Sequence, residues 1–561
     1  MSTVQAVSST AFTDKYLETA KERERHVDAV LTSASDKKVV VAGPGTGKTF
    51  LFKKVLEGKT NALTLTFVNA LVEDLSLDLF GLSEVRTLHS FARGLLAKIT
   101  KKEVKISPRL SEIVKNDAQI LLGKEIDFDA IFNNRDDENE LIRFFAKRKQ
   151  YYGQYGYSDV IFAAVRYLEK NRGAIPAFEQ IVVDEFQDFN QLEVSLIDLL
   201  AERSPVLIAG DDDQALYDFK SASARHIRER HANTKPDYAA FSLPFCSRCT
   251  RVIVGATNDI ITAAKTQGLL KGRIEKAYRY FDAKGKDEES DQSPQLIHRQ
   301  VFASQIPWII EKEITAMALD TKAKFSVLVI SPTRTQSRTL AASLQTKGFS
   351  NLELSEKRGD RQAETLDALR LLLENAKDNL GWRILIKFLL EPEKVIEIVG
   401  ATDKDATKPI YDLVGRIIRA DVRRLVGVVK AIKAGKTVKD EDLARLLEVL
   451  DLGPYELTRR ELRRDIGSDE HVSNSGIRKI AVKTTTVQSS KGLAADLVFI
   501  THFDDQFFVK DKDKKKISDQ DVCKFLVALT RAKKRVVLIS STKKDPTFLN
   551  WIQQDRVDRR K

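Results

Sequence analysis

Cysteine is scarce in this chain, which has three cysteines among 561 residues. Three thiols cannot build a disulfide framework, and their scarcity favours a reducing compartment, here expected to be the cytoplasm. Apolar runs are short, and none approaches the roughly 18–20 residues needed to span a bilayer. The N-terminal residues also lack the basic and apolar regions of a secretory signal. The sequence therefore predicts neither a disulfide scaffold nor a membrane partner.

Positive charge is in excess. The chain has 92 Lys and Arg against 80 Asp and Glu, for a net charge of +12. Such an excess fits a polyanionic partner, because neutralising phosphates releases counterions. A basic surface without such a partner would explain the net charge equally well. The sequence motifs are therefore needed to distinguish the two interpretations. The length predicts about three to five domains.

Short apolar runs rich in Val, Ile and Leu alternate with helical stretches. Runs with little polar alternation are typical of parallel strands covered on both faces, so we expect parallel α/β sheets. The expected strands are residues 38–43, 62–67, 181–185, 205–210, 326–331, 496–503 and 535–540. Two regions, about 91–170 and 361–479, contain no clear strand and predict helical insertions.

The first expected strand is followed by AGPGTGKT, which fits the Walker A pattern apart from its initial alanine. Small residues let backbone N–H groups surround phosphate oxygens at a helix N-terminus. Lys48 is predicted to reach the β- and γ-phosphates of ATP, and Thr49 to ligate Mg²⁺. The other expected nucleotide-binding residues are Ala42, Gly43, Pro44, Gly45, Thr46 and Gly47.

A pair of carboxylates ends the strand in IVVDEFQD. Asp184 at the strand end is predicted to hold Mg²⁺. The adjacent Glu185 is predicted to act as the general base that activates water. An acidic strand end is common in proteins. Together with the Walker A loop earlier in the chain, however, this acidic pair indicates a nucleotide-hydrolysing site.

Further motifs follow in a fixed order along nearly the whole chain. They resemble motifs of the superfamily 1A helicases of the UvrD/Rep/PcrA type. In outline the chain is also similar to compact anti-phage relatives such as the Gabija helicase component. The matching segments are TFVNAL (66–71), TLHSFAR (87–93), DEFQD (184–188), AGDDDQALYDF (209–219), LPFCSRCT (243–250), TTVQSSKGL (485–493) and VALTRA (527–532).

The resemblance implies two RecA-like domains with ATP between them, each interrupted by a helical insertion. The expected boundaries are 1–90 and 171–255 for domain 1A, 91–170 for insertion 1B, 256–360 and 480–545 for domain 2A, 361–479 for insertion 2B, and 546–561 for a C-terminal tail.

The resemblance also assigns roles to single residues. Gln214 would sense the γ-phosphate, and Arg248 and Arg531 would act as arginine fingers on it. Gly492 would join the nucleotide-binding residues. Residues expected to contact single-stranded DNA or a single-strand/duplex junction are Phe67, Asn69, His89, Tyr217, Phe219, Gln488 and Lys491. For the phenylalanines a core position, and for His89 a structural role, remain alternatives.

Some positions depart from the family pattern. Ser247 stands where a tyrosine usually stacks on adenine, and Ala494 replaces a glutamate thought to hold the ribose. Gln488 replaces a histidine, and His26 lies near the place of an adenine-reading glutamine. We therefore expect loose discrimination among nucleoside triphosphates, or recognition of adenine by other residues.

Two patterns carry no site prediction. Cys246 and Cys249 have CxxC spacing, but no second ligand pair would complete a zinc site, so they are expected to be buried neighbours of Arg248. The basic helical face with Arg416, Arg419 and Arg423, and TRRELRR (458–464), could contact duplex DNA or simply be solvated.

The leading hypothesis is a Mg²⁺- and ATP-dependent single-stranded-DNA translocase and helicase, with 3′→5′ polarity implied by the family. The alternative is a nucleic-acid-sensing NTPase subunit that controls a partner nuclease with little unwinding. A P-loop kinase would leave the later motifs unexplained.

Overall fold

The computed structural model describes residues 9–67, 69–216, 221–232, 238–281, 295–320, 325–349, 352–354, 360–434, 443–450, 480, 482–509 and 516–560. The chain divides into two compact units. The first unit comprises Met1–Leu88, Gly173–Glu356 and Ser475–Lys561, and the second comprises His89–Arg172 and Lys357–Asn474. None of the described helices has the length and apolar character needed to cross a membrane.

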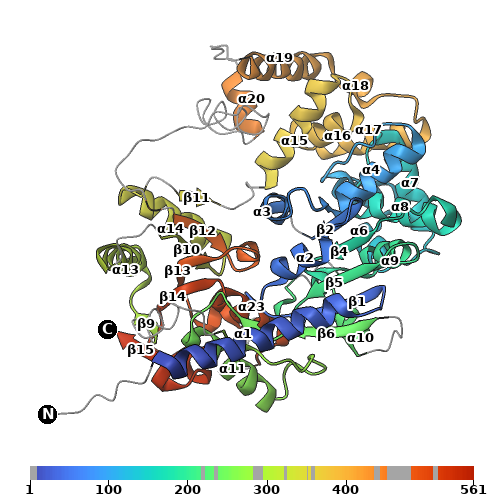
Figure 1. Ribbon diagram of the computed structural model, residues 1–561. Helices are drawn as coiled ribbons and strands as arrows, with labels where there is room; N and C mark the ends of the chain where they lie inside the picture. Colours follow the sequence, from blue (N-terminus) through green and yellow to red (C-terminus); the bar gives the residue numbers. More distant parts are fainter. Residues whose placement is uncertain are drawn as a thin grey trace. The chain divides into compact units, whose positions relative to one another are not determined.

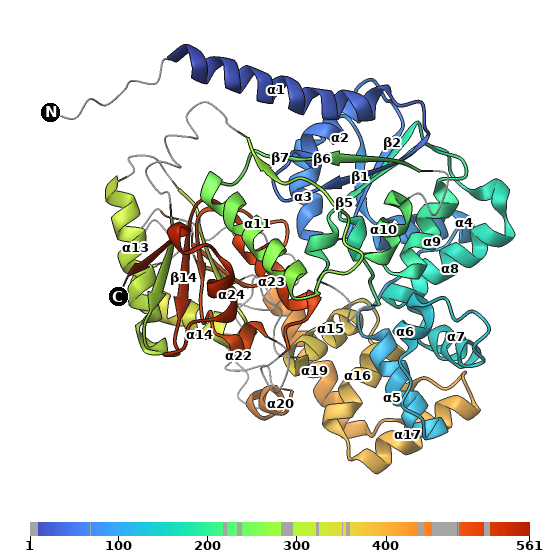
Figure 2. The same cartoon turned by 90° about the horizontal axis from the view of Figure 1, so that it is seen from below.

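A six-stranded sheet in the order β3-β2-β4-β5-β1-β6 forms what we call the first lobe of unit 1 (Figure 1). All its strand pairs are parallel. The strands are β1 (Lys37–Ala42), β2 (Ala62–Thr66), β3 (Glu84–Thr87), β4 (Gln180–Val183), β5 (Val206–Gly210) and β6 (Ala239–Leu243). Its helices are α1 (Ser9–Thr32), α2 (Lys48–Leu56), α3 (Asn69–Asp78), α9 (Gln191–Leu200) and α10 (Arg225–His231). Figure 2 shows α1 lying along β6, which it contacts.

A seven-stranded parallel sheet in the order β11-β12-β10-β13-β14-β9-β15 forms the second lobe. Its strands are β9 (Leu296–Gln300), β10 (Val327–Ser331), β11 (Leu352–Leu354), β12 (Val482–Thr486), β13 (Ala495–Ile500), β14 (Ala532–Ser540) and β15 (Val557–Arg560). A two-stranded ladder pairs β7 (Phe245–Cys246) with β8 (Arg279–Tyr280).

Successive residues of the second sheet point to opposite faces, as a pleated strand requires. Leu328 and Val498 pack on the face covered by α11 (Arg251–Thr266), α23 (Asp519–Leu529) and α24 (Thr547–Trp551). Their neighbours Val327 and Leu497 pack on the other face, against α13 (Ile306–Asp320) and α14 (Arg334–Thr346). Helices on both faces explain why these strands are apolar throughout.

The second unit is helical in its described residues. Both predicted insertions contribute to it, since α16 contacts α5 and α7. Its helices are α4 (Leu88–Thr100), α5 (Leu110–Leu122), α6 (Phe128–Asn133), α7 (Leu141–Tyr152), α8 (Tyr157–Lys170), α15 (Asp360–Glu374), α16 (Asn379–Leu389), α17 (Pro392–Lys404), α18 (Ile410–Leu413), α19 (Arg416–Lys433) and α20 (Leu443–Val449).

The two insertions share a buried ion network. Asp117 on α5 binds Arg148 of α7 at 2.7 Å and Arg383 of α16 at 2.9 Å. The hydroxyl of Tyr152 donates to the same carboxylate at 2.6 Å. Each of these four side chains is at most 3% exposed, so the network ties the insertions together inside one core.

The parallel α/β class with two sheets is confirmed. Residues 546–561, expected as a tail, instead contain α24 and the strand β15, which pairs with β9. They therefore belong to the second lobe. The predicted basic segment 458–464 lies outside the described residues.

Candidate functional site

The loop between β1 and α2 has the backbone shape of a phosphate-binding loop. Gly45 and Gly47 are left-handed, with φ of 70° and 98°, a conformation that favours glycine. A Cβ atom on Gly45 would lie 2.3 Å from the Cβ of Arg248. The hydroxyl of Thr46 donates to the carbonyl of Gly43 at 2.9 Å. Because α2 begins directly after this loop, its N-terminal dipole adds to the attraction for an anion.

The ammonium of Lys48 lies between the two predicted acidic residues. Its Nζ is 2.8 Å from Glu185 Oε1 and 3.2 Å from Asp184 Oδ1. Although burial alone would lower it, attraction by both carboxylates raises the pKa of Lys48. For Glu185 the directions are reversed. Burial alone would raise the pKa of this carboxyl, but attraction by Lys48 and Lys491 lowers it. Lys48 and Glu185 are therefore both charged at neutral pH.

Asp184 and Thr49, the predicted magnesium ligands, both offer oxygen atoms near Lys48. Asp184 follows β4, is 7% exposed, and accepts a hydrogen bond from the backbone N–H of Glu185 at 2.9 Å. Thr49 follows Lys48 in the first turn of α2. A carboxylate and a hydroxyl beside a phosphate-binding loop are the hard oxygen ligands that Mg²⁺ prefers.

Gln214 joins the two lobes. Its Oε1 accepts a hydrogen bond from Arg531 Nη2 at 2.8 Å, and its Nε2 donates to Asp211 Oδ2 at 2.7 Å. Arg531 lies between α23 and β14 and is 3% exposed. Burial, followed by repulsion from Arg248, lowers the pKa of Arg531 to about 10. The two predicted arginine fingers are thus close enough to affect one another, and Arg531 remains charged at neutral pH.

Lys491, predicted to contact the DNA strand, lies inside the site. It is 4% exposed, pairs with Asp188, and lies 3.4 Å from Glu185. Its Nζ also donates to the carbonyl of Gln214 at 2.8 Å. Asp188 and Gln214 belong to the first lobe, so these contacts give Lys491 a second link between the lobes. The contact of Lys491 with a DNA strand stays a prediction.

Ser247 is bonded to the phosphate loop. Its backbone N–H and its hydroxyl both donate to the carbonyl of Gly45, at 2.9 and 3.1 Å. Tyr278, which the sequence did not single out, donates its hydroxyl to the carbonyl of Pro44 at 2.9 Å. A Cβ atom on Gly43 would lie 2.9 Å from the Tyr278 ring. No motif marks Tyr278; its aromatic neighbours in the run YRYF are the available signal.

A small pocket opens beside the phosphate loop. Its lining includes Arg23, His26, Phe50 and Phe245. The His26 ring lies edge-on to Phe245, with centroids 6.3 Å apart, and Arg23 lies over the Phe50 ring at 5.9 Å. His26, expected from its place in the sequence, is therefore at the site.

The other residues predicted to contact the DNA strand differ in their burial and in the unit to which they belong. Phe67 follows β2, is half-buried, and lies 5.9 Å from the Phe189 ring. Gln488 is half-buried in a 3-10 turn, and Gly492 shortly after it has a positive φ of 83°. His89 belongs to the helical unit, where its ring lies edge-on to Tyr157 at 5.2 Å. Asn69 begins α3, but its side chain is outside the described residues, as are Tyr217 and Phe219.

The CxxC cysteines are buried, as expected, and neither forms a disulfide. Cys249 donates its backbone N–H to Cys246 Sγ at 3.4 Å and its thiol to the carbonyl of Thr530 at 3.7 Å. Although burial would raise it, hydrogen bonds from Cys249 and Tyr278 lower the pKa of Cys246 to about 6. Among the described residues, neither cysteine belongs to a cluster that could hold a metal.

Two stretches of the chain match known domains. Residues 133–235 match the UvrD/REP helicase N-terminal domain, and residues 416–543 match the UvrD-like helicase C-terminal domain. A probable DNA helicase II homolog of Mycoplasma genitalium is 24% identical over 352 residues, which are 52% of this chain and 49% of that relative. DNA helicase II of Escherichia coli is 39% identical over 85 residues, 15% of this chain and 12% of that protein.

PcrA of Staphylococcus aureus, an ATP-dependent DNA helicase, is 29% identical over 122 residues, 20% of this chain and 16% of that protein. The chain thus covers less than half the length of each of these relatives. Two parallel-sheet lobes around a phosphate-binding loop define a P-loop nucleotide-binding protein. Within that class, the chain is similar to the UvrD/Rep type of superfamily 1 helicases over the matched residues.

Proposed function

We propose that this chain is an ATP- and Mg²⁺-dependent motor that moves 3′→5′ along single-stranded DNA and separates duplexes. The observation that best supports this proposal is the hydrogen bond from Arg531 of the second lobe to Gln214 of the first. It supports a nucleotide site that is complete only when both lobes contribute. The DNA substrate rests on the relatives named as DNA helicases and on the net charge of +12.

Hydrolysis begins with an exchange of partners at Lys48. When the ammonium turns to phosphate oxygens, Glu185 loses its nearest cation, which raises the pKa of that carboxylate and makes it a better base for water. Thr49 and Asp184 would hold Mg²⁺, whose charge would neutralise that of the phosphate oxygens. Arg248 and Arg531 then stabilise the negative charge that develops on the transferred phosphoryl group.

Coupling to DNA runs through motif III, which contains Gln214. Phe67 stacks on a base at the first lobe, and Tyr217 and Phe219 are proposed to stack on bases as well. Asn69, His89 and Gln488 supply polar contacts. Stacking contributes about 1–3 kcal/mol per base and tolerates any sequence, as a translocase requires.

The alternative is a nucleic-acid-sensing NTPase subunit that regulates a nuclease and unwinds little. The buried network around Asp117 favours it, because insertions locked into one core leave less freedom for domain rotation. Hydrolysis without strand separation distinguishes this alternative.

ATP hydrolysis, measured with and without single-stranded DNA, tests the proposal. We expect stimulation by DNA, and a loss of about 100-fold or more in both Lys48→Ala and Arg531→Ala. DNA binding should persist in both variants, because neither residue is proposed to contact the strand. Lys54→Ala is the matched control, since Lys54 lies on the same helix and pairs with Glu57 in solvent. Wild-type turnover in either site variant would show that the nucleotide site is misassigned.

A further inference from the structure

A segment outside the recognised motifs contacts the site at several points. It runs from Leu270 to Tyr278, between α11 and β8. Besides the Tyr278 contact to Pro44, it carries Arg273 and Lys276, whose side chains are 5% and 6% exposed. The backbone N–H of Leu270 donates to Asp519 on α23 at 2.8 Å. The segment is therefore anchored to the second lobe while it touches the first.

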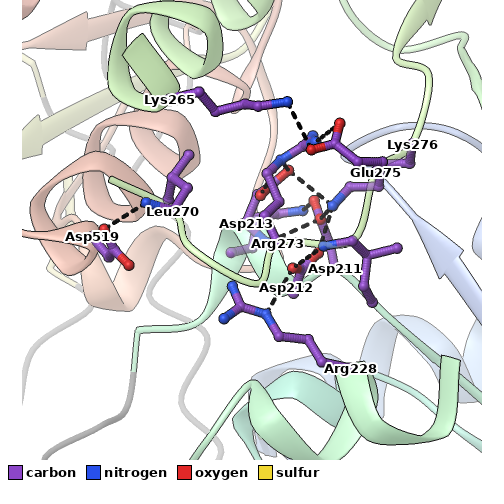
Figure 3. Close-up of polar contacts among 12 residues, drawn as sticks. Asp211, Asp212, Asp213, Arg228, Lys265, Leu270, Arg273, Glu275, Lys276 and Asp519 are labelled. Carbon is purple, nitrogen blue, oxygen red and sulfur yellow. Dashed lines mark hydrogen bonds and ion pairs between the residues drawn. The ribbon is translucent and has the colours of Figure 1, made fainter. Parts of the chain in front are cut away.

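Lys276 sits among three consecutive carboxylates at the end of β5 (Figure 3). Its Nζ lies 2.9 Å from Asp211, 2.6 Å from Asp212 and 2.9 Å from Asp213. The three carboxylates are close enough together to ligate a metal ion. The ammonium, however, already lies within hydrogen-bond distance of all three.

Charge in this cluster is balanced. Arg273 binds Asp213 at 2.8 Å, and Arg228 binds Asp212 at 3.0 Å. Three cations therefore face three carboxylates. Although burial would lower it, attraction by Asp211, Asp213 and Asp212 raises the pKa of Lys276. Lys276 thus keeps its charge in a site where an unpaired ion would be costly.

Lys276 is linked to the proposed γ-phosphate sensor through one carboxylate. Asp211 Oδ1 binds Lys276, while Asp211 Oδ2 accepts from Gln214 Nε2 at 2.7 Å. This second bond fixes which end of the Gln214 amide faces Arg531. With Nε2 committed to Asp211, Oε1 is left to accept from the guanidinium. If the amide turned over, its donor would face another donor.

We propose that Lys276 is a positioning residue for nucleotide hydrolysis, acting through Asp211 to hold the Gln214 amide with its oxygen toward Arg531. This inference rests on the proposed function, because it uses the sensor role of Gln214. The ion pairs of Lys276 are with Asp211, Asp212 and Asp213 rather than with the acidic pair of the active site. Its loss therefore lowers the rate of hydrolysis and leaves nucleotide affinity nearly unchanged.

A double-mutant cycle on the full chain tests this positioning role. We expect Lys276→Met to lower kcat at least tenfold, with the Kd for ADP changed by less than twofold. In a Gln214→Ala background the same substitution should change kcat by less than twofold, since the amide is already gone. Lys265→Met is the control: Lys265 is on α11 and pairs with Glu275 at 2.7 Å in solvent, so its kcat should stay at the wild-type value.

The outcomes separate the two proposals. If Gln214→Ala hydrolyses ATP at the wild-type rate, the sensor role itself fails. If Gln214→Ala is slow but Lys276→Met costs the same in both backgrounds, only the positioning role is overturned. If Lys276→Met does not fold by circular dichroism, Lys276→Met combined with Asp213→Asn removes one charge of each sign. In that case the effect of Lys276→Met on kcat is measured in the Asp213→Asn protein, with and without Gln214→Ala. Asp213→Asn alone is the reference.

Discussion

Ser247 is held against the phosphate loop by its bonds to Gly45, so it offers no flat surface to a base. Among the described residues of the adjacent pocket, Phe50 is 49% exposed, and His26 and Arg23 are partly exposed. Ring and guanidinium faces stack on any base and discriminate weakly. The altered nucleotide motifs thus point to recognition by stacking.

This arrangement predicts loose nucleotide selectivity. We expect kcat/KM for ATP, GTP and CTP to agree within about tenfold, because stacking supplies little discrimination. Phe50→Ala should raise KM for each nucleotide about fivefold through loss of an aromatic contact. The control is Phe80→Ala, since Phe80 is 87% exposed in the turn before β3. Strict use of ATP by the wild-type protein would contradict the prediction.

His298 gives the second lobe a sensitivity to acid. Its ring is 3% exposed and bonded to Ser540 at 2.9 Å. Burial, then repulsion from Arg559, lowers the pKa of His298 to about 4. Because the folded state binds the proton less tightly than the unfolded state, this group stabilises the fold above pH 6.5. That stability is lost as pH falls toward 4.

Denaturant unfolding between pH 7 and pH 4 measures this effect. Wild-type protein should lose on the order of 2 kcal/mol more than His298→Gln over this range, because glutamine does not titrate. Parallel pH profiles for the two proteins would show that His298 is not the group responsible.

Among the elements, the apolar strands were predictable and the others were not. The runs at β1, β2, β4, β5, β10, β13 and β14 are apolar because helices cover both faces. β12 reads VKTTT, which looks polar in the sequence although its threonines are buried in the fold, so this strand was not predicted. β15 reads VDRR and lies at the edge of its sheet, where charged residues are tolerated.

The candidate site was predictable wherever a motif is contiguous in sequence. Lys48, Glu185 and their neighbours follow strands, and parallel strands bring their carboxyl ends to one edge. Tyr278 and Lys276 were missed because their partners lie far away in the chain and no local pattern marks such a contact. The burial of Lys491 was missed for the same reason, since its partner Asp188 is in the other lobe.

The helical unit should depend on one carboxylate that three of its helices share. Asp117→Asn leaves Arg148 and Arg383 buried with weaker partners, which should cost about 3–5 kcal/mol. Trp382, on α16 and 1% exposed, reports unfolding of this unit by fluorescence. Lys115→Ala on the same α5 is the control, because its pair with Glu125 is exposed and screened by solvent, so its loss should leave the stability nearly unchanged. Equal stability of both variants would contradict a structural role for Asp117.

At the scale of the whole molecule, the two lobes are joined at the nucleotide site by Arg531 with Gln214 and by Lys491 with Asp188. Both links meet residues beside Glu185, so a change in phosphate charge there is felt by both lobes. Such coupling is what a translocase needs to turn hydrolysis into movement along a strand. A purely sensory NTPase needs the same links but no net movement.

Strand displacement on tailed duplexes tests the motor function most directly. With ATP and Mg²⁺, the purified chain should separate a duplex carrying a 3′ single-stranded DNA tail and leave blunt and 5′-tailed duplexes intact. Lys48→Ala should separate none of them. DNA-stimulated hydrolysis without displacement of any tailed duplex would contradict the motor function and favour the sensory subunit.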